Sequence, residues 1–88
     1  MKLKYQMGIQ KILDFWAAIP VGKDASRYKG VMSLNETAKD MIEMLKDDVT
    51  EEQIVAKLLA DYDVTEEELR RHVADFLQKL REEGILVE

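Results

Sequence analysis

Residues 49–54 read Val-Thr-Glu-Glu-Gln-Ile, and residues 64–69 read Val-Thr-Glu-Glu-Glu-Leu. In both stretches the threonine can accept a bond from the backbone three residues later, where a Gln or Glu can reach back, which is a capping box. The apolar residues on either side form a hydrophobic staple, and the acidic first turn suits the positive end of a helix dipole. The two stretches therefore predict helices that begin at Thr50 and Thr65.

Apolar spacing extends these starts into three helices. Asn35 is a good N-cap for an earlier helix that ends near Lys46, before Asp47-Asp48 breaks the pattern. The third helix is predicted from about Glu66 to Glu83, with Gly84 as its C-terminal stop. We expect the second helix to bury Ile54, Leu58, Leu59 and Tyr62, and the third to bury Leu69, Val73, Phe76 and Leu80.

The first third of the chain has the pattern of strands. Residues 5–20 lack helical periodicity and fall into two short apolar runs, which predict two strands joined tightly at Leu13-Asp14. Residues 21–30 are predicted to be a loop, and residues 31–34 a short third strand. Strands followed by helices predict an α+β fold, and 88 residues fit one domain spanning residues 1–88.

Composition excludes several kinds of site and of partner. The chain has no cysteine, so no disulfide framework or thiolate metal site is expected. The net charge of −5 argues against nucleic-acid binding, although residues 1–34 carry +4 and residues 35–88 carry −9. No apolar stretch is long enough to span a membrane, and none follows the basic start as a secretory signal would. We therefore expect a cytoplasmic protein without membrane contact.

No group of residues has the pattern of a catalytic centre. His72, the only histidine, falls on the third helix beside the predicted buried stripe, where a structural or solvent-edge role is the simplest interpretation. The acidic pairs are explained by capping, and the chain has no glycine-rich phosphate loop. We expect neither enzymatic activity nor a bound metal or cofactor.

Two surfaces are better suited to binding. A four-residue strand at a sheet edge, Val31-Met32-Ser33-Leu34, leaves backbone groups free to pair with an extended peptide. On the third helix, a second stripe beside the buried one can form the wall of a groove or be an ordinary solvated face. It consists of Arg70, Ala74, Leu77 and Arg81, with Leu77 nearest the boundary with the buried stripe.

The sequence resembles the PqqD family, named after the D protein of pyrroloquinoline quinone biosynthesis. The most specific part is Leu-Asn-Glu-Thr-Ala at residues 34–38, and the resemblance covers the chain from about residue 9. Ile19-Pro20 and Gly84-Ile85-Leu86 also fit, together with the apolar spacing of the helices. The loop at residues 21–30 is longer than in quinone-pathway members, so another modified-peptide system is expected.

The resemblance implies a fold and a function. Family members are winged-helix-like domains with three strands followed by three helices. They act as peptide chaperones, or recognition elements, for ribosomally made and post-translationally modified peptides. They hold the leader of a precursor peptide for a modifying enzyme, often a radical S-adenosylmethionine enzyme. The leader adds to the third strand and packs on the third helix, which implies contacts with Val31, Met32, Ser33, Leu34, Arg70, Ala74, Leu77 and Arg81.

Two other functions compete with peptide binding. The second and third helices can form a helix-turn-helix for DNA, but the recognition helix would then begin with Thr65-Glu66-Glu67-Glu68, which phosphates repel. Alternatively, the open edge strand can pair with its own copy and make a structural or regulatory homodimer.

Overall fold

The computed structural model describes residues 1–25 and 30–88, and this part of the chain forms five strands and three α-helices. The predicted loop at residues 21–30 contains a short 3-10 helix, Gly22–Asp24, and its residues 26–29 lie outside the described residues. Most strands precede the helices, which confirms the predicted α+β class, although one short strand, Leu86–Val87, follows the last helix.

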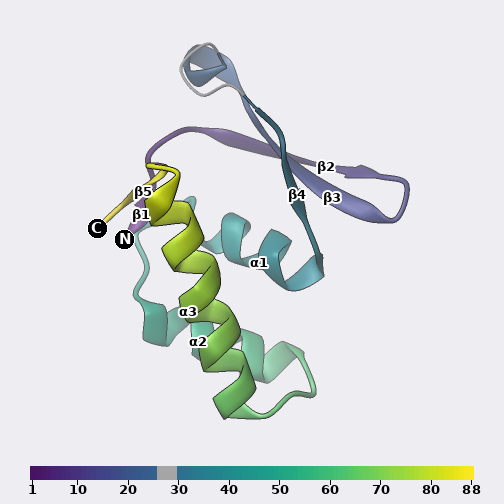
Figure 1. Cartoon of the computed structure of the whole chain (residues 1–88), viewed down its shortest axis with the longest axis vertical. Helices are drawn as coiled ribbons and strands as arrows, with labels where there is room; N and C mark the ends of the chain where they lie inside the picture. The colour runs from purple at the N-terminus through teal and green to yellow at the C-terminus, as the bar shows by residue number, and fades with distance from the viewer. Residues whose placement is uncertain (26–29) are drawn as a thin grey trace.

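Three strands form an antiparallel sheet in the order β2-β3-β4 (Figure 1). They are β2 (Met7–Ile12), β3 (Phe15–Pro20) and β4 (Met32–Leu34). Ile12 pairs with Phe15, so the turn is Leu13-Asp14 as predicted. The shorter β4 pairs with residues 16–18 of β3 and forms one edge of the sheet.

A second, two-stranded sheet, which the sequence pattern did not predict, joins the ends of the described chain. Here β1 (Lys2–Leu3) pairs antiparallel with β5 (Leu86–Val87). The Leu3 N–H also donates to the Leu45 carbonyl at 2.9 Å, which ties β1 to the end of the first helix. Figure 1 shows both ends beside the C-terminal end of α3. Two-residue strands are too short to show alternation in a sequence, because long-range pairing alone defines them.

The three helices begin where their caps predict. They are α1 (Glu36–Met44), α2 (Glu51–Asp61) and α3 (Glu66–Glu82). Asn35 accepts from the Ala38 N–H at 2.9 Å, and the box at Thr50 and Gln53 is complete in both directions. At Thr65 only half of the predicted box forms: its hydroxyl accepts from the Glu68 N–H at 3.2 Å.

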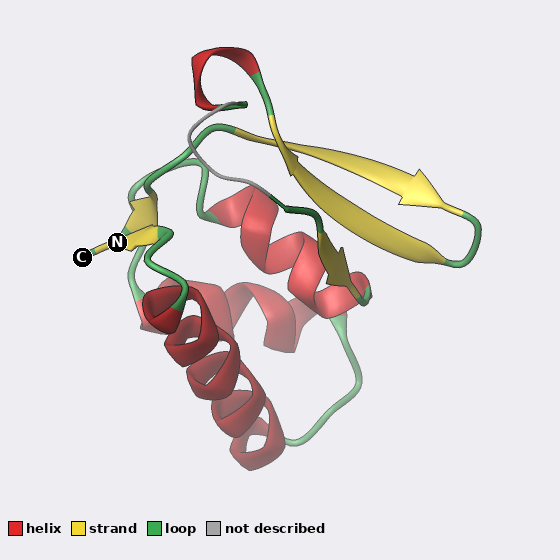
Figure 2. Ribbon diagram, turned by 45° about the horizontal axis from the view of Figure 1, so that its top comes forward, coloured by secondary structure: helices red, strands yellow, loops and turns green. Residues whose placement is uncertain are grey.

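The core lies between the three-stranded sheet and the two C-terminal helices, with α1 between them (Figure 2). The buried stripe of α3 differs from the prediction at one turn: Leu77 is fully buried at 0% exposure, whereas Phe76 is only half-buried. The prediction that Leu77 stands at the boundary of the core is therefore wrong. No helix among the described residues has both the length and the apolar character needed to cross a membrane.

Candidate binding groove

The edge strand β4 has the features that strand addition requires. Met32 and Leu34 point into the core, with 6% and 3% exposure, whereas Ser33 between them is exposed. Val31, just before the strand, is 62% exposed. Because β4 ends the strand order, alternate backbone N–H and C=O groups on its outer side face away from β3.

A groove continues from the end of β4 between α1 and α3. Leu34 leads directly into Asn35, the N-cap of α1, and the groove begins there. On the α1 side the groove is lined by the buried Ala38 and Met41, and on the α3 side by the half-buried Phe76. The full lining comprises Asn35, Thr37, Ala38, Met41, His72, Asp75, Phe76 and Lys79.

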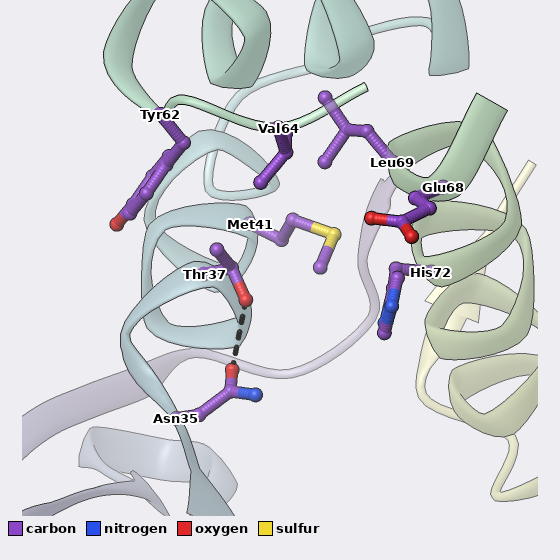
Figure 3. Close-up of a pocket in the computed structure, with 8 residues that line it drawn as sticks. All are labelled: Asn35, Thr37, Met41, Tyr62, Val64, Glu68, Leu69 and His72. Atoms are coloured by element: carbon purple, nitrogen blue, oxygen red, sulfur yellow. Dashed lines mark hydrogen bonds between the residues drawn. The ribbon is translucent and has the colours of Figure 1, made fainter. Parts of the chain in front are cut away.

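The groove deepens into a pocket of about 180 Å³ near the start of α3 (Figure 3). Four residues line both hollows: Asn35, Thr37, Met41 and His72. The pocket adds Tyr62, Val64, Glu68 and Leu69, and its lining is mostly apolar. Asn35 is held at the entrance because its side-chain oxygen accepts from the Ala38 N–H and from the Thr37 hydroxyl at 3.0 Å.

Glu68 and His72 are the polar side chains that α3 contributes to the pocket. In Figure 3 the Glu68 carboxylate extends from α3 towards Met41, and the His72 ring lies below it in the gap between α1 and α3. Glu68 was predicted to fold back onto Thr65, but within residues 1–25 and 30–88 its carboxylate makes neither this bond nor an ion pair. Both side chains are exposed to solvent and are accessible to a ligand.

The outer wall of the pocket is fixed by a polar link between α1 and α2. The Tyr62 hydroxyl donates to Asp40 at 2.5 Å, and Asp40 also pairs with Lys39 at 2.7 Å. Burial raises the pKa of Tyr62, and its bond to Asp40 raises it further. For Asp40, burial acts to raise the pKa, but the hydrogen bonds from Lys39 and Tyr62 together outweigh it and hold the pKa below its usual value. Lys39 lies 4.7 Å from the centre of the Trp16 ring, which extends the link to β3.

The predicted arginine stripe lies on the opposite flank of α3. Arg70 is 42% exposed and pairs with Glu52 of α2 and with Glu66, both at 2.8 Å. Arg81 pairs with Glu88 at 3.0 Å. Hydrogen bonds to these carboxylates raise the pKa of both arginines, and the bond from Arg70 lowers the pKa of Glu52. Intramolecular partners therefore already occupy both guanidinium groups.

The structure thus brings together some of the predicted residues and separates others. Met32, Ser33 and Leu34 form β4, which leads into the groove at Asn35, whereas Val31 precedes the strand at its other end and does not line the groove. Arg70, Ala74 and Arg81 do not line it, and Leu77 is in the core. The residues that line it on α3 were missed, although His72 had been noted beside the buried stripe. Sequence spacing shows that a helix has two flanks but not which one faces β4.

The composition of the groove is suited to peptide binding. Among the described residues, no three His, Cys, Asp or Glu side chains come together to hold a metal ion. The groove combines an apolar floor, an open strand edge and a few exposed charges, a composition common in peptide-binding surfaces.

Comparison with known proteins places this fold in a family. The model of the family "Coenzyme PQQ synthesis protein D (PqqD)" matches residues 23–86. This match covers most of the chain and includes β4, all three helices and both hollows. A search of curated proteins finds no match.

Two solved structures share the fold. TbiB1, solved in complex with the TbiA(beta) leader peptide, has a TM-score of 0.74 and 21% identity over 98% of this chain and 94% of its own. Lasso peptide synthetase B1, complexed with the leader peptide, has a TM-score of 0.69 and 18% identity over 99% of this chain and 96% of its own. At these identities the likeness establishes the fold.

Proposed function

This chain belongs to the PqqD family, and from that premise we propose that it binds the leader segment of a precursor peptide. The leader adds as a strand to the open edge of β4 and continues into the groove between α1 and α3. The single observation that carries the proposal is that this edge strand leads directly into an apolar groove. Leader peptides bound to TbiB1 and to lasso peptide synthetase B1, which have the same fold, support it.

The surface is sufficient for useful affinity. Each backbone hydrogen bond on β4 contributes about 1 kcal/mol net, and each apolar side chain that becomes buried adds about 1.5–3 kcal/mol. A few of both outweigh the cost of ordering the peptide and give a dissociation constant in roughly the micromolar range.

The biological role we propose is presentation rather than chemistry. The chain holds the leader while a separate enzyme modifies the rest of the precursor, and the family resemblance points to a radical S-adenosylmethionine enzyme.

Titration with synthetic leader segments tests the function. The probes are the N-terminal halves of short peptides encoded beside the gene, and calorimetry measures their affinity. Phe76→Ala removes an apolar contact of the groove and should weaken binding roughly tenfold. Arg70→Glu combined with Arg81→Glu changes the opposite flank and should leave the affinity within about twofold.

The reverse result would assign the peptide to the arginine flank, where contacts of Arg70, Ala74 and Arg81 stay a prediction. Thermal unfolding of each variant shows whether a loss of affinity reflects a loss of fold. If no leader binds to the wild-type chain, peptide capture is wrong.

Self-association is the second candidate, and the open edge of β4 is the observation that favours it. Two copies that pair through β4 would form a twofold dimer and cover the groove entrance. Light scattering over a dilution series distinguishes the two: a dimer that dissociates when leader is added shares the β4 site with the peptide.

A further inference from the structure

The pocket near the start of α3 has a chemistry that specifies what it binds. We infer that it takes a lysine or arginine side chain of the bound leader, with Glu68 as the counter-ion. This inference rests on the proposed function, since the side chain belongs to the peptide that pairs with β4. It adds a requirement on the leader sequence: a basic residue just beyond the segment that pairs with the strand.

The walls of the pocket fit the methylene stem of such a side chain. Met41 and Leu69 are buried beneath it, and Val64, 43% exposed, forms part of its rim. Long basic side chains pack their methylenes on apolar surface and keep their charged ends in water. A cavity of roughly 150 Å³ can hold benzene, so about 180 Å³ accommodates a stem of three or four carbons.

Glu68 places a negative charge where the end of that stem would lie. Its carboxylate points to the pocket, as Figure 3 shows, instead of closing the cap at Thr65. The corresponding Gln53 of α2 does close its cap, with a bond of 2.9 Å from the Thr50 N–H. The two helix starts have nearly the same sequence, so the difference leaves the Glu68 carboxylate available to a ligand.

The charged side chains of α3 along the groove are acidic near the pocket and basic at the opposite end. On this flank of α3, Glu68 and Asp75 are acidic and Lys79 is basic, and within the described residues no ion pair occupies any of them. On the other flank, by contrast, the arginines are paired with carboxylates. Glu68 and Lys79 are eleven residues apart, which is about 16 Å along the helix. A cation is therefore favoured at the pocket end, near Glu68, and disfavoured near Lys79.

An apolar side chain fits the pocket less well. It would fill the same volume but would cover the Glu68 carboxylate without offering it a donor, and covering an unpaired charge is costly. A cation gives Glu68 a charge-assisted partner, and His72 beside it can contribute a second polar contact.

The experiment pairs two isosteric variants of the protein with substituted leaders. Glu68→Gln removes the charge from the pocket and keeps the backbone N–H that Thr65 caps. Glu67→Gln is the matched control, because it removes the same charge from the same helical turn at an exposed position that does not line the pocket. The probe is the leader segment that binds the wild-type chain, made also with each lysine replaced by norleucine and each arginine by citrulline.

We expect Glu68→Gln to weaken binding roughly threefold to tenfold and Glu67→Gln to change it less than twofold. Replacing the basic residue that enters the pocket should weaken binding to the wild-type chain by a similar factor. The same replacement should not weaken binding to Glu68→Gln any further. Added salt should weaken leader binding to the wild-type chain more than binding to Glu68→Gln.

Equal effects of the two variants on affinity, or a bound leader without a basic residue, would overturn the inference and leave leader binding intact. Failure of every leader to shift β4 resonances would remove both.

Discussion

Leu13 is a single residue in a conformation that its side chain does not favour. It occupies the first position of the β2–β3 turn with φ of 55°, and 89% of its side chain is exposed. The left-handed region costs a non-glycine residue roughly 1–2 kcal/mol, and here little burial offsets that cost. The sequence predicted where the turn would be, because two apolar runs end there, but not its backbone geometry.

Replacing Leu13 with glycine should therefore stabilise the protein. Glycine adopts positive φ freely, and the gain exceeds the added flexibility of its unfolded chain, which leaves a net increase of up to about 1 kcal/mol. Urea unfolding measures it. Asp14→Gly is the control: the neighbouring Asp14 is not in the positive-φ region, so glycine there should cost about 0.4–1 kcal/mol through the greater entropy of the unfolded chain. Destabilisation by Leu13→Gly would indicate that the leucine side chain contributes contacts in the folded state.

At the scale of elements, local signals were predicted well and packing choices were not. Asn35, Thr50 and Thr65 cap their helices as expected, because a cap depends on residues within one turn. Phe76 was predicted to be buried and Leu77 to lie at the boundary of the core, but Leu77 is buried and Phe76 is half-buried. Both lie near the border of the buried stripe, and packing decides which of them enters the core. The groove flank of α3 was missed for the same reason: it depends on where α1 and β4 lie.

The link between α1 and α2 predicts a pH dependence of stability. The pKa of Asp40 is lower in the folded chain than its usual value near 3.8. A lowered pKa stabilises the fold above the unfolded value, and this contribution is lost as the pH falls through the folded value. We therefore expect the stabilisation from ionised Asp40 to be complete at pH 7 and to decrease progressively below about pH 4.

Asp40→Asn should lower the free energy of unfolding at pH 7 and flatten its decrease in acid. Chemical unfolding from pH 7 to pH 2 measures both effects. Asp61→Asn is the matched control, because Asp61 is more exposed and makes only a surface pair with Lys57 at 3.2 Å. Equal slopes for wild type and Asp40→Asn would show that the contact with Tyr62 does not contribute to acid stability.

At the scale of the whole molecule, the fold leaves one continuous surface from an open strand to a pocket. The ends of the described chain close a sheet of their own, β1 with β5, at the far end of α3 from the pocket. The three-stranded sheet remains open at β4 (Figure 1), and β4 leads into the groove. The sequence predicted the β4 edge because turn residues bound a short apolar run, whereas the pocket required two segments far apart in the sequence, residues 35–41 and 62–72, to meet.

The most direct test of the central claim, strand addition to β4, is an NMR titration of labelled protein with leader segments at a concentration where the chain is monomeric. Strand addition predicts saturable shifts at residues 32–34 and at His72 and Phe76, with slower hydrogen exchange at the outward-facing amides of β4. Binding that leaves the β4 amides unchanged, with shifts confined to the arginine flank of α3 or to the other edge strand, β2, would contradict it.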